Sequence, residues 1–168
     1  MEYAIENEYL IVTVTTWGAQ VKSVLRKFDD VEHMWQADKS VWGYHAPILF
    51  PHTGKVVDDL IETKGEVYQA KQHGFARLME HTLVRQTEDT IVMELRSSEE
   101  TLRIFPYAFR LVSTFTLDGD TLHHKLTVEN WDADKLYFGI GYHPAFTVPF
   151  DDEHTLSDYE LRFSEPES

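Results

Sequence analysis

Residues 71–78, KQHGFARL, place a histidine and an arginine on either side of a glycine and a phenylalanine, directly before a predicted strand. The planar Arg77 guanidinium suits hydroxyl or phosphate oxygens, and His73 can supply a hydrogen bond or a proton near neutral pH. Loops before rigid strands commonly carry functional side chains. The pattern favours a polar binding site slightly over a surface loop with an ordinary arginine.

Residues 139–146, GIGYHPAF, raise a related question about His143. The glycines before it permit close approach of other groups to the backbone, and Pro144 fixes the direction of the chain after it. This arrangement holds one imidazole in one place. His143 is therefore either a packed structural histidine or a proton donor.

Residues 43–55, GYHAPILFPHTGK, read as a loop, a buried strand and a second loop. In the functional interpretation, His45, His52 and Lys55 line a polar pocket at the two ends of the strand. Taken alone, the segment is better explained as a buried strand with solvated ends.

The nine histidines suggest a metal site, for which a cupin-like β-barrel is the natural host. However, His123 and His124 are adjacent, so a strand directs them to opposite faces. No His-x-His pair is followed by a nearby glutamate, and no dinucleotide or phosphate-binding glycine motif is present. We therefore expect no metal and no cofactor.

Several aromatic side chains could stack on the C–H face of a sugar, although most are expected to be buried in the core. They are Trp17, Trp35, Trp42, Trp131, Phe75, Phe146 and Phe150. Composition alone does not separate the two roles; Phe75, between His73 and Arg77, is kept as a candidate for substrate contact.

The net charge of −14 argues against nucleic acid and anionic membranes as partners, since both select positive surfaces. The absence of cysteine excludes disulfides and thiolate metal sites. No signal peptide and no run as long as a membrane span can be recognised. These features predict a cytoplasmic protein.

Strand-like segments rich in β-branched and aromatic residues run through the chain. They are residues 9–15, 20–27, 78–85, 90–96, 109–117, 121–130 and 136–142. One helical turn is expected at 97–104, where Ser97 and Glu100 fit a capping box. The predicted fold is a single all-β domain, residues 1–168, built as an antiparallel sandwich.

The clearest hairpin signal is Asp118-Gly119, read as a two-residue loop. This register pairs Phe115 with Leu122 and Ser113 with His124. It also predicts that His124 faces the core and that His123 faces solvent.

Four motifs in one order resemble the aldose 1-epimerase (galactose mutarotase) family, and its LacX-like branch in particular. They are WGYHAPILFPHTGK, QHGFAR, EETLRIFPYAFRLVSTFTLDGDTL and GIGYHPAF. The resemblance implies a large antiparallel β-sandwich of the galactose mutarotase type, a supersandwich. It also implies an isomerase that interconverts the α and β anomers of an aldose without metal or cofactor.

The resemblance further implies that His143 is the general acid and that His73 polarises the substrate. It assigns Arg77 to contacts with the sugar's hydroxyls or phosphate, beside the candidate binding residues His45, Lys55 and Phe75. The family's catalytic glutamate lies beyond Ser168, so the base is unknown here and the sandwich is expected to be incomplete. Exposed sheet edges then predict self-association. The alternatives are a non-catalytic sugar-binding remnant and a cupin-like metal-binding protein.

Overall fold

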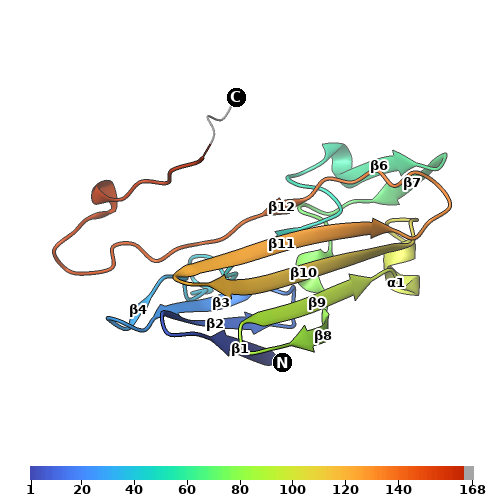
Figure 1. The fold of residues 1–168 in the computed structure, drawn as a ribbon. Helices are drawn as coiled ribbons and strands as arrows, with labels where there is room; N and C mark the ends of the chain where they lie inside the picture. Colours follow the sequence, from blue (N-terminus) through green and yellow to red (C-terminus); the bar gives the residue numbers. More distant parts are fainter. Residues whose placement is uncertain (165–168) are drawn as a thin grey trace.

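Apolar and polar side chains alternate along β2 (Leu10–Thr15), as expected for a strand with one buried face. Leu10, Val12 and Val14 are buried, and the residues between them are partly exposed. The structure, a computed structural model, describes residues 1–164, and nearly all of its regular elements are strands (Figure 1). The predicted all-β class is confirmed.

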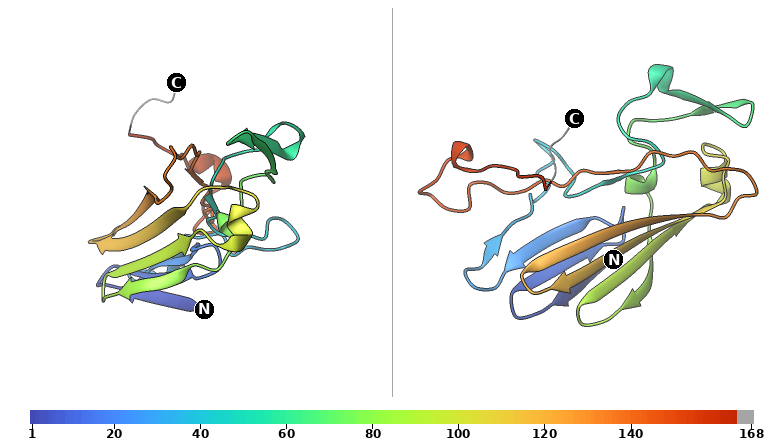
Figure 2. Two further views of the ribbon diagram at one scale, coloured as in Figure 1. Left: turned by 90° about the vertical axis from the view of Figure 1, so that its right-hand side faces the viewer. Right: turned by 45° about the horizontal axis from the view of Figure 1, so that its top comes forward.

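Two four-stranded antiparallel sheets lie against each other in two layers (Figures 1 and 2). The first has the order β1-β2-β3-β4, formed by Glu2–Glu6, Leu10–Thr15, Val21–Arg26 and Val31–Glu32. The second has the order β11-β10-β9-β8, where β8 is Thr82–Gln86, β9 is Thr90–Arg96, β10 is Phe109–Asp118 and β11 is Thr121–Asn130. The strands expected at 90–96 and 121–130 have the predicted bounds. The strand expected at 78–85 begins later, after a 3-10 turn at Ala76–Leu78.

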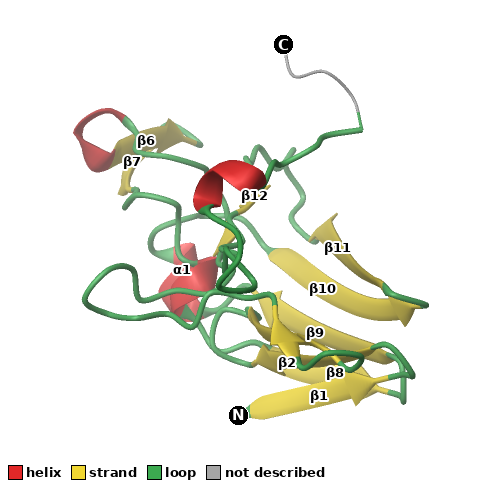
Figure 3. Ribbon diagram, turned by 90° about the vertical axis from the view of Figure 1, so that its left-hand side faces the viewer, coloured by secondary structure: helices red, strands yellow, loops and turns green. Residues whose placement is uncertain are grey.

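Shorter elements flank the two sheets. β5 (Ile48–Leu49) pairs with β12 (Gly141–Tyr142), and β6 (Leu60–Thr63) forms a hairpin with β7 (Glu66–Gln69). The helical elements, red in Figure 3, are α1 (Glu99–Leu102) and 3-10 turns at Val57–Asp59, Ala76–Leu78 and Leu156–Asp158. Within residues 1–164, no helix is long and apolar enough to cross a membrane.

The core is centred on Phe50, whose side chain is fully buried. Its ring centroid lies 6.1, 5.9, 5.1 and 5.8 Å from the rings of Phe75, Phe105, Phe109 and Phe138. Phe50 directly follows β5, and Phe109 is the first residue of β10. This cluster therefore fixes β5, the short strand between the site loops, against the second sheet.

The helical turn and the last predicted strand differ from expectation. Ser98, and not Ser97, caps α1, because the Ser97 hydroxyl instead accepts the N–H of Phe109 at 3.3 Å. The strand expected at 136–142 is reduced to Gly141–Tyr142. Its partner β5 lies between two prolines, Pro47 and Pro51, which have no N–H to extend a ladder.

The hairpin between β10 and β11 turns one residue later than predicted, because Asp118 pairs with Thr121. The predicted pairs are therefore wrong: His124 lies opposite Phe115, and Ser113 lies opposite Leu126. The faces are nevertheless as predicted, since the pairing moves by two positions and side chains alternate with a period of two. The His124 ring stacks on Phe115 at 4.2 Å, and its buried Nε2 has no partner among the described residues.

One side of the sandwich is closed and the other is open. On the closed side, β1 and β8 meet, and the Gln86 amide donates a hydrogen bond to the Ala4 carbonyl at 2.7 Å. On the open side, β11 pairs only with β10 within residues 1–164. The core-facing Leu122 and Leu126 of β11 are only partly buried, whereas the corresponding positions of β10 are buried. β11 is thus an exposed sheet edge.

We expect the burial of His124 to make the stability pH-dependent. Burial lowers the pKa of His124 from 6.5 to about 4, because the folded state favours the neutral imidazole. The free energy of unfolding is therefore unaffected by this group above the unfolded pKa, and it decreases as the pH falls from there towards about 4. Between these limits, the unfolding free energy should fall about 2–3 kcal/mol further in the wild type than in His124→Gln. Urea unfolding at pH 7 and pH 4 measures this difference. The matched control is His123→Gln, an exposed neighbour, which should keep the wild-type slope. Equal slopes for His124→Gln and the wild type would contradict the buried, neutral imidazole.

Candidate functional site

The loop that carries His73 is fixed to the central strand by its own backbone. Gly74 bridges Phe50, and the Phe50 carbonyl accepts the N–H groups of Phe75 at 2.9 Å and Ala76 at 3.2 Å. Gly74 has φ +68°, and a Cβ atom there would lie 2.2 Å from the Phe50 oxygen. Only glycine fits at this position, both for conformation and for space.

His73 also has a positive φ, +67°, which a residue with a side chain rarely adopts. Two contacts with Gly54 hold it: the His73 N–H donates to the Gly54 carbonyl at 2.9 Å, and Nδ1 accepts the Gly54 N–H at 3.0 Å. In the neutral ring, Nε2 therefore carries the hydrogen and is a donor; the Gln72 amide lies 3.2 Å from it and can accept this hydrogen only through its oxygen. Burial and the nearby Arg77 cation lower the pKa of His73, which favours this neutral donor form.

The segment that carries His143 lies along the other edge of β5. Gly141 pairs with Leu49, and the His143 N–H donates to the Pro47 carbonyl at 3.1 Å. A Cβ atom on Gly141 would meet the Thr53 side chain at 2.9 Å. The glycine before His143 therefore allows close packing, and the histidine emerges on the exposed surface where this packing ends.

These two loops bring His73 and His143, seventy residues apart in sequence, to a ring separation of 6.3 Å. His143 also contacts the Trp42 ring at 5.0 Å, and Trp42 contacts Tyr44 at 5.6 Å. The Arg77 guanidinium lies over Tyr44 at 5.0 Å. The two histidines, the arginine and the two aromatic rings thus form one continuous surface, which we call the histidine–aromatic cluster (His73, His143, Trp42, Tyr44 and Arg77).

Arg77 does not use all of its hydrogen-bond donors within the described residues. One of its terminal N–H groups donates to the Gln72 carbonyl at 3.2 Å, and its buried Nε has no partner among the described residues. The backbone of Arg77 is held from behind by Gly18, whose Cβ position would lie 2.7 Å from the Arg77 carbonyl oxygen. The guanidinium is therefore positioned, and part of it remains available to a ligand.

The other predicted binding residues have different surroundings. His45 is partly buried, and its Nδ1–H donates to the Trp35 carbonyl at 2.7 Å, which assigns this nitrogen to holding the loop. Phe75 is only 8% exposed and packs in the core around Phe50, so its predicted role in substrate binding stays a prediction. Lys55 is exposed directly after Gly54, the residue that binds His73. His52 donates through Nε2 to the Lys71 carbonyl at 2.8 Å.

No sequence pattern singles out Trp42 and Tyr44 as site residues. Trp42 is only one of several aromatic residues that could stack on a sugar, and Tyr44 lies in a loop whose histidines are the stronger signal. Both lie beside the catalytic candidates only because residues 38–45 fold back towards the His143 segment. Spacing along the chain gives no signal for such a contact.

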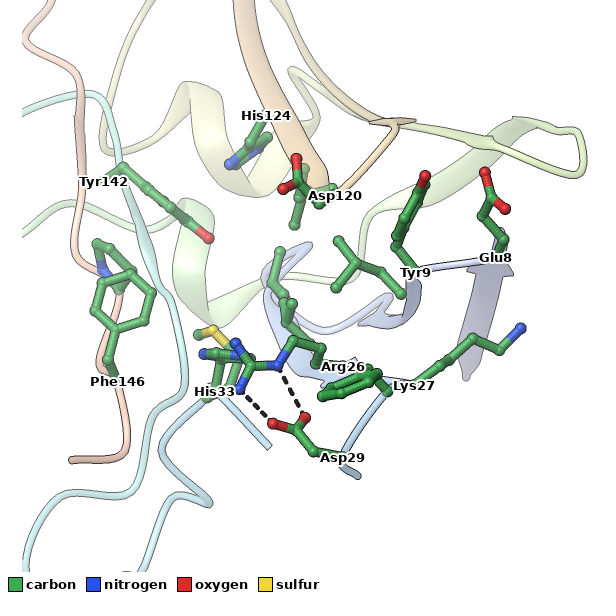
Figure 4. Close-up of a pocket in the computed structure, with 17 residues that line it drawn as sticks. Glu8, Tyr9, Arg26, Lys27, Asp29, His33, Asp120, His124, Tyr142 and Phe146 are labelled. Atoms are coloured by element: carbon green, nitrogen blue, oxygen red, sulfur yellow. Dashed lines mark hydrogen bonds and ion pairs between the residues drawn. The ribbon is translucent and has the colours of Figure 1, made fainter. Parts of the chain in front are cut away.

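A cavity of about 920 Å³ lies elsewhere, at the open side between the two sheets. It is lined by Val21, Val24, Arg26, His33, Met34, Leu122, His124, Tyr142, Pro144 and Phe146, among others. Figure 4 shows His124 and Tyr142 directed into this groove and the Arg26–Asp29 ion pair at its side. Tyr142 and Phe146 flank His143 in sequence, so the segment that carries His143 separates the groove from the histidine–aromatic cluster.

Residues 1–164 contain no group of three or more histidine and carboxylate side chains placed to hold a metal ion. The cupin-like alternative therefore finds no support in the arrangement of the nine histidines.

The two antiparallel sheets and the pair of neighbouring histidines define a β-sandwich protein with a candidate polar site on the loops beside β5. The chain belongs to the aldose 1-epimerase family, whose model matches residues 1–167. It is 35% identical to the protein LacX of Lactococcus lactis over 175 residues, which cover 100% of this chain and 58% of LacX.

Two solved structures show the same fold. A galactose mutarotase related enzyme from Lactobacillus acidophilus has a TM-score of 0.91 at 35% identity, over 94% of this chain and 53% of that one. A galactose mutarotase-like protein from Lactobacillus casei has a TM-score of 0.86 at 33% identity, over 91% and 52% of the two chains. The predicted family and the mutarotase-type sandwich are confirmed. The chain spans little more than half the length of these relatives.

We expect Gly74→Ala to disrupt the site loop more than a comparable change elsewhere. Gly65 is the matched control, because its φ is +78° and no atom lies within 4 Å of its Cβ position. Both substitutions force alanine into a left-handed conformation, but only Gly74→Ala also clashes with Phe50. The clash should cost Gly74→Ala about 1–3 kcal/mol more in unfolding free energy and shift the His73 ring resonances. Equal losses in the two variants would show that the loop is not fixed by this contact.

Proposed function

We propose that the histidine–aromatic cluster is the sugar site of a mutarotase, which interconverts the α and β anomers of an aldose by opening and closing its ring. The observation that carries this proposal is the 6.3 Å separation of the His73 and His143 rings. An acid and a donor at that separation can reach one sugar, and the family match supplies the class of substrate.

In this mechanism, His143 in its protonated form donates a proton to the ring oxygen of the sugar. His73 donates a hydrogen bond from Nε2 near that oxygen, and the free N–H groups of Arg77 bind hydroxyl groups. A base removes the proton of the anomeric hydroxyl, the bond between C1 and the ring oxygen breaks, and C1 becomes an aldehyde. Rotation about the bond from C1 to C2, followed by closure with the reverse proton transfers, gives the other anomer.

The His73 side of the cluster offers no carboxylate that could act as the base. The charged groups that shift the pKa of His73 are Arg77, His143 and His52, all basic side chains. We propose that the base comes from polypeptide corresponding to the part of the relatives that this chain does not span. The 168-residue chain alone then acts as a sugar-binding unit, which is also the second candidate function.

We expect the 168-residue chain to bind an aldose but to give little or no acceleration of mutarotation. General acid catalysis alone is worth about 10²–10⁴-fold, and opening the ring also requires the base. Saturation-transfer NMR with galactose and glucose should detect binding, which His73→Gln and His143→Gln should weaken. The control His154→Gln changes an exposed histidine paired with Asp151 and should leave binding unchanged. Polarimetry of freshly dissolved α-galactose measures turnover; a rate equal to that of full-length LacX would show that a base lies within this chain.

We also propose that the chain self-associates through its open side and, as the sequence suggests, that it is cytoplasmic. An exposed edge strand offers unpaired N–H and C=O groups, and the groove beside it offers an apolar surface. The net charge of −14 opposes indiscriminate aggregation but leaves the edge hydrogen bonds unmade.

Sedimentation velocity at micromolar concentration should show a dimer or larger species for the wild type. Leu122→Glu places a charge in the groove and should shift the distribution towards monomer. His123→Glu adds the same charge to the exposed opposite face of β11 and should leave the distribution unchanged. Circular dichroism verifies that both variants are folded. A monodisperse wild-type monomer would exclude association through this edge.

A further inference from the structure

In the histidine–aromatic cluster, Trp42 lies between His143, the proposed acid, and Tyr44, on which Arg77 packs. Its ring lies 5.0 Å from the His143 ring, at an angle of 39°, and 5.6 Å from the Tyr44 ring. Tyr44 in turn lies beneath Arg77. His143 is exposed, so its imidazole has few other contacts to restrict its rotation. Trp42 is the largest side chain that the structure places against it.

The loop of Trp42 is held more firmly than an ordinary surface loop. The Trp42 N–H donates to the Asp38 carbonyl at 2.7 Å, and the Trp42 carbonyl accepts the Trp35 indole N–H at 2.8 Å. The Asp38 carboxylate accepts the Ser40 N–H at 2.8 Å, which closes the turn. Trp35 is itself bound to the His143 segment, because its backbone N–H donates to the Ala145 carbonyl at 3.0 Å.

These contacts create one rigid unit from two segments that are about a hundred residues apart. Trp35 binds the His143 segment through its backbone and the Trp42 loop through its indole. The Trp42 ring is thereby held at a fixed position beside His143. Because the Trp42 ring is held by contacts from both segments, it can fix the orientation of the His143 imidazole that packs against it.

We propose that Trp42 is a positioning residue that holds the His143 imidazole in the site, and that Trp42 and Tyr44 form the apolar wall on which a pyranose lays its C–H face. The inference rests on the proposed function for the identity of the ligand, but the contact between Trp42 and His143 is independent of it. The half-buried aromatic rings supply the apolar surface, and Arg77 and His73 supply donors at its border.

The contact with His143 can be tested without sugar, because a protonated imidazole quenches the fluorescence of an indole that it touches. The charged and titratable groups near the pair are His73, Arg77 and Tyr44 in the cluster, and Asp38 and Lys39 on the Trp42 loop. Of these, only histidines normally change charge between about pH 5 and pH 8. Acid quenching of Trp42 in this range therefore reports its contact with His143 or the nearby His73.

We expect the wild-type emission to fall on acidification, with a component that disappears in both Trp42→Phe and His143→Gln. The matched controls are Trp131→Phe, an exposed tryptophan beside Arg96, and His73→Gln; both should keep this component. Persistence of the component in Trp42→Phe or in His143→Gln overturns the positioning role. Loss of the quenching component in His73→Gln alone would show that His73, and not His143, contacts Trp42, and this result would also overturn the positioning role.

The wall is tested by sugar titration of the same variants. Trp42→Ala should weaken galactose binding about two- to tenfold, and Trp42→Phe, which keeps an aromatic ring, should restore most of the loss. Unchanged affinity in Trp42→Ala overturns the wall. If no variant and no wild-type protein binds any aldose, the proposed function and the wall both fail, whereas acid quenching still decides whether Trp42 positions His143.

Discussion

Backbone hydrogen bonding on both edges of residues 48–50 determines where the two halves of the site meet. On one edge, the Phe50 carbonyl binds the segment that follows Gly74. On the other, β5 pairs with β12, the strand directly before His143. Both partners need glycine to come close enough, and the Phe50 ring fixes the shared strand in the core. The distance between the two histidines thus depends on main-chain geometry and does not require direct bonding between their side chains.

The main strands were predictable because their patterns are local. β11 alternates between more and less buried positions over most of its length, and β9 is a short run rich in β-branched and other apolar residues; both patterns indicate strands. The register of the β10–β11 hairpin was not predictable to the residue, since Asp118-Gly119-Asp120 allows two positions for the turn. The short β12 was overestimated because its length depends on its distant partner, β5, and that dependence leaves no periodicity in the sequence.

For the site, the sequence could supply residues but not their surroundings. Glycine beside His73 and His143 correctly marked positions where the chain comes close to other backbone. Nothing in the motif HGFAR shows that Phe75 is buried while Arg77 is only partly buried, because their directions depend on a 3-10 turn at Ala76–Leu78 that the sequence does not signal. The role of Trp42 depends on ring packing between distant segments, which no spacing in a single sequence encodes.

Residues 142–146 have two faces with different neighbours. Tyr142 and Phe146 line the groove at the open side, and His143 between them faces the cluster. Because one short backbone carries both faces, a polypeptide packed into the groove and a ligand bound beside His143 act on the same few torsion angles. Thermodynamic linkage then makes the two effects reciprocal. If ordering of the His143 segment strengthens packing in the groove, packing in the groove strengthens ligand binding beside His143 by the same free energy. The architecture thereby couples packing in the groove to the orientation of His143.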